Sequence, residues 1–335
     1  MRIAVIGAGA IGSLVAGYLK LKGEDVYLVA RPDALKAGTE NGLKISGIRG
    51  DFKVDISIYD TLISKPELLI LATKTQDIER ALKDNLSLFK DAIVLTTQNG
   101  IQAEKIVAKF IPKNNIFSSI VMFGATYLEP GKVVHNFEGA WVLGSIFFNI
   151  TDPRMLSLSM ALNKAFPAVI TNEIAEMKYL KIFVNANNCI PAILGVSMQE
   201  AFIYPEVSRI SIGIWQEGFR IVSKLGIKLV SLPGFPIENI TKLISMPPDS
   251  AAQVFSGIMS KLSRDPLYGS ILQSIMRGRA SEIDYINGEF VNLADQHGLK
   301  ADLNRKLVAM VHEVERTKKF FTRAEFLNAV GGLLN

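Results

Sequence analysis

A lone lysine in an otherwise uncharged stretch is the clearest candidate for chemistry in this chain. Residues 179–194 contain one charged side chain, Lys181. On a helix, Asn185 and Asn188 share the face of Lys181, so the three side chains form a polar strip. An ammonium there can hydrogen-bond a carbonyl oxygen and protonate it, as a general acid does. Two alternatives are open: the Lys181 head can reach water while its stem is buried, and Lys178 is a rival proton donor one turn earlier.

A glycine-rich turn is the second candidate site. The letters G-A-G-A-I-G, from residue 7 to residue 12, follow a strand predicted over residues 2–6 and precede a helix predicted over residues 13–21. In this context the first glycine permits a tight turn, the second lets the backbone approach a pyrophosphate, and the third lets the helix pack on the strand. The N–H groups that begin the helix can then bind the anion. The pattern predicts a dinucleotide site made by Gly7, Gly9, Ala10, Ile11 and Gly12. The alternative is a turn that only joins strand to helix.

The residue after the next strand indicates which dinucleotide is bound. Arg31 comes two residues after a strand predicted over residues 25–29. An acid in this region suits the ribose 2′-hydroxyl of NAD, whereas an arginine suits a 2′-phosphate, so we expect NADPH/NADP⁺. Asp33 is nearby but is more simply interpreted as a cap of the following helix. Arg31 as a solvated surface charge is the alternative.

The composition limits the class of protein. With 335 residues, of which 49% are hydrophobic and 21% charged, the chain is long enough for two well-buried domains. Its net charge of +5 is spread without a dense basic run, which gives nucleic-acid binding little support. No stretch approaches the ~20 apolar residues that span a bilayer. The single cysteine and the three scattered histidines favour neither a disulfide nor a metal site, and they fit a cytoplasmic protein.

The elements that must position these residues fall into two groups. Apolar runs alternate with helical patterns early in the chain, which is typical of a parallel sheet covered by helices. The predicted strands there cover 68–72 and 92–97, and the predicted helices cover 76–89 and 101–110. Three closely spaced strands, a helix and a short strand follow, predicted over 116–123, 132–136, 140–147, 153–166 and 168–170. Because turns separate the three strands, we expect an antiparallel extension of the sheet. Helical periodicity with Pro and Gly breaks then continues to the end, so we predict an α/β Rossmann domain over 1–170 and an all-α domain over 171–335.

Polar residues follow the third and fourth strands of the predicted sheet. Lys74 and Asn99 therefore lie at carboxyl ends of parallel strands, where open sheets bind ligands. Lys74 suits a cofactor phosphate or a substrate carboxylate, and Asn99 suits the nicotinamide ribose or amide. The alternatives are a solvated lysine and an ordinary Asn-Gly turn.

Taken together, these motifs resemble the ketopantoate reductase (2-dehydropantoate 2-reductase) family, within the larger 6-phosphogluconate-dehydrogenase-like group. The resemblance spans both predicted domains. The residues that carry it are the G-x-G-A-I-G turn, Lys74, Asn99-Gly100, the Lys-x-x-x-Asn helix, Ser270, and Glu-Ile-Asp-Tyr-Ile-Asn-Gly over residues 282–288. The last stretch is the most specific local mark.

The resemblance implies a role for each candidate residue. Lys181 would be the general acid, and Glu282 would be the second catalytic group, orienting substrate beside the cofactor. The substrate-binding set would be Asn99, Asn185, Asn188 and Ser270, and Arg31 and Lys74 would bind the cofactor with Asn99 and Glu282. The implied activity is NADPH-dependent reduction of ketopantoate, a small 2-keto acid, to pantoate in pantothenate and coenzyme A biosynthesis, by a monomer or homodimer.

Two positions depart from the family pattern. Eight residues after the lysine the family usually has asparagine, where this chain has Cys189, and four residues after Ser270 it often has aspartate, where this chain has Ser274. Both changes concern the substrate. A reductase of another 2-keto acid and an opine-type dehydrogenase therefore stay open, as does a non-catalytic NADPH-binding sensor. Cys189 itself is a poor nucleophile, because an apolar helix raises the pKa of a thiol.

Overall fold

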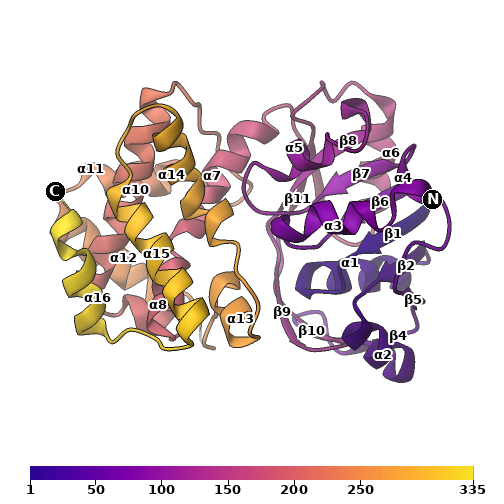
Figure 1. Ribbon diagram of the computed structural model, residues 1–335, viewed down its shortest axis with the longest axis horizontal. Helices are drawn as coiled ribbons and strands as arrows, with labels where there is room; N and C mark the ends of the chain where they lie inside the picture. Colours follow the sequence, from indigo (N-terminus) through magenta and orange to yellow (C-terminus); the bar gives the residue numbers. More distant parts are fainter. Residues whose placement is uncertain (264, 335) are drawn as a thin grey trace. The chain divides into compact units, whose positions relative to one another are not determined.

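The computed structural model describes residues 1–263 and 265–334. The chain divides into two compact units, Met1–Lys178 and Tyr179–Asn335, and helix α7 (Ile174–Ala186) contains the division. In Figure 1 the first unit runs from indigo into magenta and the second continues to yellow. The domain boundary predicted after residue 170 comes directly after β12 (Ala168–Ile170) and stays a prediction.

The first unit is built on an eight-stranded sheet in the order β12-β11-β8-β7-β6-β1-β2-β5. Its other strands are β1 (Arg2–Ile6), β2 (Asp25–Val29), β5 (Ile58–Tyr59), β6 (Leu68–Leu71), β7 (Ile93–Thr96), β8 (Ile116–Val121) and β11 (Trp141–Gly144). Every neighbouring pair is parallel except β11 with β8, which is antiparallel. The predicted Rossmann-like sheet with an antiparallel extension is therefore confirmed, and β11 is the antiparallel strand.

Both faces of this sheet are buried. Along β1, Ile3 and Val5 belong to one core while Ala4 and Ile6 belong to the other, as the two-residue period of a strand requires. Helices α1 (Ala10–Leu21) and α6 (Pro153–Leu162) cover the first face. The opposite face is covered by α3 (Ile78–Lys83), α4 (Leu86–Phe89) and α5 (Ala103–Val107). Strands buried on both sides read as continuous apolar runs, which is why the sequence identified them.

A second, four-stranded sheet lies in the same unit, in the order β4-β3-β10-β9. It comprises β3 (Leu43–Gly47), β4 (Phe52–Val54), β9 (Gly124–Glu129) and β10 (Lys132–Phe137), and α2 (Pro32–Asn41) precedes it. The prediction that residues 132–136 extend the main sheet is therefore wrong, because β10 pairs in parallel with β3. Leu43, Ile45 and Val133 are buried in the same core as α1, so this sheet packs on that helix.

The helix predicted over residues 76–89 is interrupted. The segment contains a 3₁₀ turn, η1 (Thr75–Asp77), followed by α3 and α4. At the break, the buried Asn85 side chain accepts a hydrogen bond from Leu62 N–H (2.7 Å) and donates one to the Ala81 carbonyl (2.8 Å). An asparagine that bonds the backbone in this way competes with continued helix.

The second unit is helical, and the predicted all-α region is confirmed. Its helices after α7 are α8 (Cys189–Leu194), α9 (Met198–Phe202), α10 (Pro205–Lys224), α11 (Glu238–Ser245), α12 (Pro248–Met259), α13 (Ser270–Met276), α14 (Asn287–Gln296), α15 (Asp302–Thr317) and α16 (Arg323–Val330). Helix α10 packs against α12, α11 and α15 and forms the centre of this unit (Figure 1). Within the described residues, no helix has both the length and the apolarity required to cross a membrane.

Candidate active site

The glycine-rich turn forms at the carboxyl end of β1, as its spacing predicts. Gly7 has a φ of +111°, and a Cβ added there would lie 2.7 Å from the carbonyl carbon of Ala72. A Cβ at Gly12 would lie 1.9 Å from the Gly7 carbonyl oxygen, whereas one at Gly9 would meet nothing within 4 Å. Helix α1 begins at Ala10, so its first N–H groups have no acceptor within the helix. The turn therefore has the open approach and the donors that a pyrophosphate requires.

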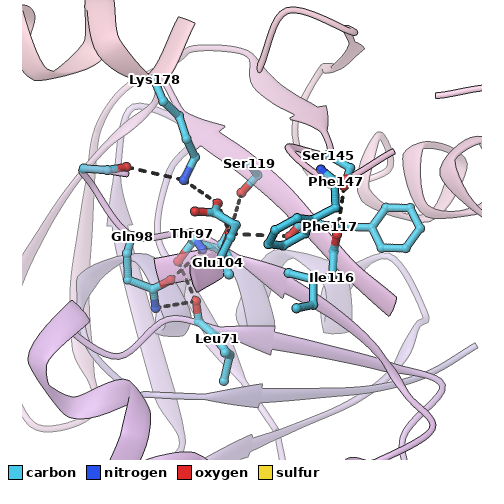
Figure 2. Close-up of polar contacts among 12 residues, drawn as sticks. Leu71, Thr97, Gln98, Glu104, Ile116, Phe117, Ser119, Ser145, Phe147 and Lys178 are labelled. Atoms are coloured by element: carbon cyan, nitrogen blue, oxygen red, sulfur yellow. Dashed lines mark hydrogen bonds and ion pairs between the residues drawn. The ribbon is translucent and has the colours of Figure 1, made fainter. Parts of the chain in front are cut away.

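The loops after β6 and β7 are joined by hydrogen bonds, and Figure 2 shows those that Thr97 and Gln98 donate to Leu71. The Gln98 side-chain amide donates to the carbonyls of Leu71 (3.0 Å) and Thr73 (2.9 Å). Thr97 Oγ1 also donates to the Leu71 carbonyl, at 2.8 Å. Lys74 and Asn99, both half-buried, are the residues that directly follow Thr73 and Gln98. The structure thus brings these two candidate loops together at one edge of the sheet.

Arg31 is held by a carboxylate from another strand loop. It is the residue that precedes α2, and its guanidinium donates to Asp77 Oδ2 at 2.8 Å. Asp77 belongs to the turn η1 after β6. Asp33 lies inside the first turn of α2 rather than at its N-cap, so the predicted cap is wrong, although a carboxylate there still stabilises the helix.

Lys178 belongs to a buried ion pair. Its ammonium donates to Glu104 Oε1 at 2.5 Å, and both side chains are at most 3% exposed. Thr96 Oγ1 donates to the same oxygen at 2.7 Å. Burial would raise the pKa of Glu104, but Lys178 and these hydrogen bonds outweigh it, so the pKa lies below its ordinary value. The rival proton donor is therefore engaged with a carboxylate, which favours Lys181 as the reacting lysine.

Lys181 and Asn185 lie one turn apart on α7, and both are half-buried. Burial lowers the pKa of Lys181 to about 8. A lysine with this pKa is still mostly protonated at neutral pH, yet it releases its proton more readily than a solvated lysine. The side chain therefore has the acidity that protonation of a carbonyl oxygen calls for.

The polar strip does not continue along one helix to Asn188. Helix α7 ends at Ala186, Asn188 lies in the turn that follows, and α8 begins at Cys189. The break places Pro191 in the first turn of α8, where its missing N–H costs no hydrogen bond. Asn188 instead lies beside α13, because a Cβ added to Gly269 would be 3.1 Å from Asn188 Cγ. The structure therefore brings Asn188 next to the segment that begins with Ser270.

The loop that carries Glu282 is fixed by α15. Glu315 Oε1 accepts a hydrogen bond from Ser281 N–H at 2.6 Å, and Ile283 on the other side of Glu282 is fully buried. His312 joins this anchor through Asp284 (2.9 Å) and Glu315 (3.0 Å). Burial lowers the pKa of His312, but the two carboxylates outweigh it and raise the pKa above its ordinary value. Glu282 itself stays half-buried between these fixed neighbours.

The asparagine of the same motif has a structural role. Asn287 donates to Asn304 Oδ1 at 3.0 Å, and Asn304 in turn donates to Glu217 at 2.7 Å. All three side chains are buried, and they connect α14, α15 and α10. Cys189 is buried as well; burial strongly raises the pKa of its thiol, and the hydrogen bond from Asn287 opposes this only in part. Cys189 is thus an inert thiol, as the sequence predicts.

Three polar residues near the candidate site were not identified from the sequence. Glu104 pairs with Lys178, and Asp77 pairs with Arg31. Both are acids a few residues after Lys74 or Asn99, and this spacing was the signal that could have identified them. The third is Asn187, at the break between α7 and α8. Its amide is 3% exposed and makes no hydrogen bond with the described part of the chain. Nothing in the sequence separates it from its neighbour Asn188.

Comparison with known proteins agrees with this geometry. Residues 3–146 match the family model of ketopantoate reductase PanE/ApbA, and residues 173–315 match the model of its C-terminal part. The chain belongs to the ketopantoate reductase family. A 2-dehydropantoate 2-reductase of Pyrococcus horikoshii is 31% identical, over 94% of this chain and 98% of that protein. One from Archaeoglobus fulgidus is 27% identical over the same shares.

A solved structure extends the comparison. The ternary complex of D-mandelate dehydrogenase with NADH and anilino(oxo)acetate is 25% identical, with a TM-score of 0.80 over 95% of this chain and 99% of that one. These relatives are oxidoreductases that act on CH–OH groups, and the predicted class of enzyme is confirmed.

The buried ion pair generates a stability prediction. Lys178→Met leaves the Glu104 carboxylate buried without its partner, which costs about 3–5 kcal/mol of unfolding free energy. We expect the urea midpoint to fall while the slope of the transition is unchanged.

The double variant Lys178→Met, Glu104→Gln is the matched control, because it removes both charges. It should recover most of the loss. A single variant as stable as the wild type would contradict the pairing.

Proposed function

We propose that this protein reduces ketopantoate to pantoate with NADPH as the hydride donor and Lys181 as the proton donor. The observation that carries the proposal is the half-buried Lys181, with Asn185 one turn along α7, in a chain that also has the glycine turn at the end of β1. Burial lowers the pKa of this lysine to about 8, which supports its role. Family membership supports the substrate class.

The residues present fit a bound nicotinamide dinucleotide. A Cβ added at Gly9 would meet nothing within 4 Å, so the turn can be approached closely, and the first turn of α1 offers N–H donors. Lys74 and Asn99 lie on two loops tied together by Gln98, at the ligand-binding edge of the sheet. When bound, the reduced cofactor supplies a hydride to the ketone carbon.

The chain supplies the proton and the orientation. As the ketone carbon gains the hydride, the carbonyl electron pair moves to oxygen, and the Lys181 ammonium gives that oxygen a proton. The lysine then regains a proton from water. Asn185 lies one turn along α7 and suits the substrate hydroxyl, while Ser270 and Asn188 suit the carboxylate. Glu282 would orient the substrate from its anchored loop.

A specific observation favours a second candidate, reduction of a different 2-keto acid. Ser274 is buried, and its hydroxyl donates to the Ser270 carbonyl within α13 at 2.8 Å. Cys189 is buried as well. Neither position offers the asparagine or aspartate that the family usually presents there, and the similar D-mandelate dehydrogenase was solved with anilino(oxo)acetate.

Turnover of a keto-acid panel tests the proposal. NADPH oxidation at 340 nm is measured with ketopantoate, with a branched 2-keto acid that lacks the hydroxyl, and with an aryl 2-keto acid, each with and without an amine. We expect ketopantoate to have the highest kcat/KM. A higher value for another acid supports the second candidate, amine-dependent turnover indicates an opine-type enzyme, and cofactor binding without turnover indicates a sensor.

Lys181→Ala should lower kcat/KM by roughly 10²–10⁴-fold while NADPH still binds, because it removes the general acid. Lys181→Arg should not restore the rate, since a guanidinium keeps its proton near neutral pH. Lys242→Ala, at an exposed lysine on α11, is the control and should keep wild-type activity. Full activity in Lys181→Ala would exclude this lysine as the donor.

The pH profile should report the same group. Since the acid form of Lys181 is the active one and its pKa is about 8, kcat/KM for reduction should be level below pH 7. It should fall about tenfold per pH unit well above 8. A rate that stays constant from pH 7 to pH 10 would contradict a titrating lysine donor.

A further inference from the structure

Asp77 lies between two arginines at the edge of the sheet where the dinucleotide turn is found. Its Oδ2 accepts from Arg31 at 2.8 Å, and its Oδ1 lies 3.6 Å from the Arg80 guanidinium. Asp77 and both arginines are partly or largely exposed, so solvent and ligand can reach them. The Asp77 carboxylate is thus paired with Arg31, the residue that the sequence predicts to bind a cofactor phosphate.

The Arg31–Asp77 pair lies next to the glycine turn. Strands β2 and β6 are the two neighbours of β1, whose end carries the glycine turn. Arg31 follows β2 and Asp77 follows β6, so the ion pair joins the two segments that flank the turn. Gly7 N–H donates to the Val29 carbonyl at 2.9 Å, which holds the turn against the end of β2. Asp77 N–H donates to the Lys74 carbonyl at 2.9 Å, which fixes the carboxylate relative to that loop.

The chemistry of the two groups is opposed. In a dinucleotide-binding sheet, an acid near the adenosine ribose accepts from its hydroxyls, whereas an arginine binds a 2′-phosphate. This chain carries both, paired with each other. A 2′-phosphate bound by Arg31 would compete with Asp77 and meet a like charge, whereas a ribose hydroxyl could donate to Asp77.

We propose that Asp77 determines the cofactor selectivity of this protein, by competing with the 2′-phosphate for Arg31 and by accepting a ribose hydroxyl of NADH. The chain therefore binds NADH as well as NADPH, and this ion pair sets the ratio of the two affinities. The inference rests on the proposed function for its cofactor class, but not for its keto acid.

Equilibrium binding without any keto acid tests the proposal. NADPH and NADH are titrated separately against wild type and Asp77→Asn, with nucleotide fluorescence as the readout. We expect the NADPH Kd to fall and the NADH Kd to rise, so that their ratio moves about tenfold toward NADPH. Asp77→Glu keeps the charge and should stay near the wild-type ratio. Arg31→Ala should lose most of the preference for NADPH.

Asp84→Asn is the matched control, because it removes an exposed carboxylate just after α3. It should leave both Kd values unchanged, and thermal unfolding confirms that every variant is folded. An Asp77→Asn ratio within twofold of the wild type, or one moved toward NADH, overturns the proposal. If the ratio shifts as expected but no keto acid is reduced, the selectivity role stands and the proposed reaction fails; if neither cofactor binds the wild type, both fail.

Discussion

The absence of a side chain at Gly7 and at Gly12 is the constraint on which the glycine turn and the loops beside it depend. Any Cβ at Gly7 would meet the Ala72 backbone, and any Cβ at Gly12 would meet Gly7 itself. Because both are glycine, α1 can begin directly against the ends of β1 and β6. The close approach of Gly7 to Ala72 positions the start of the loop that carries Lys74. The hydrogen bond from Gly7 N–H to the Val29 carbonyl positions the end of β2, two residues before Arg31. Three ligand-side segments thus take their positions from one turn.

Lys178 and Lys181 lie one turn apart on α7 but have different surroundings. Lys178 is buried with Glu104, so its charge is balanced within the protein and serves stability. Lys181 undergoes desolvation that lowers its pKa to about 8 and makes it a better acid. The same kind of side chain is therefore a structural anchor at one position and, in the proposed function, the proton donor at the other. Sequence spacing alone could not decide between them, because both lie on an apolar helix.

The sequence predicted those parts of the fold that depend on local pattern. Strands β1, β2 and β12 have the predicted bounds, since short apolar runs between turn signals leave little choice. The second sheet was missed because β3 and β4 are short and alternate polar with apolar residues. The strand that pairs with β3, β10, is distant in the sequence, since Lys132 lies opposite Lys44. The helix break before Cys189 has a local signal in Pro191, which lacks the N–H that a continuous helix needs. The position of Asn188 beside Gly269 depends on tertiary packing, which no local pattern specifies.

Some residues of the candidate site could likewise be predicted from the sequence, and others could not. Residue types and spacing were enough to name the glycine turn, Arg31 and Lys181 as candidates. Their partners, Asp77 and Glu104, come from other strands and helices and become visible only when the chain is folded. The pKa of Lys181 likewise depends on burial that no periodicity specifies.

The most direct measurement follows the hydride itself. Purified protein is given ketopantoate and NADPH in which both hydrogens at C4 are deuterium, and the product is examined by mass spectrometry and NMR. The account predicts pantoate one mass unit heavier, with deuterium at C2 and none elsewhere. Consumption of NADPH with unlabelled product, or without any pantoate, would contradict hydride transfer to the 2-keto carbon.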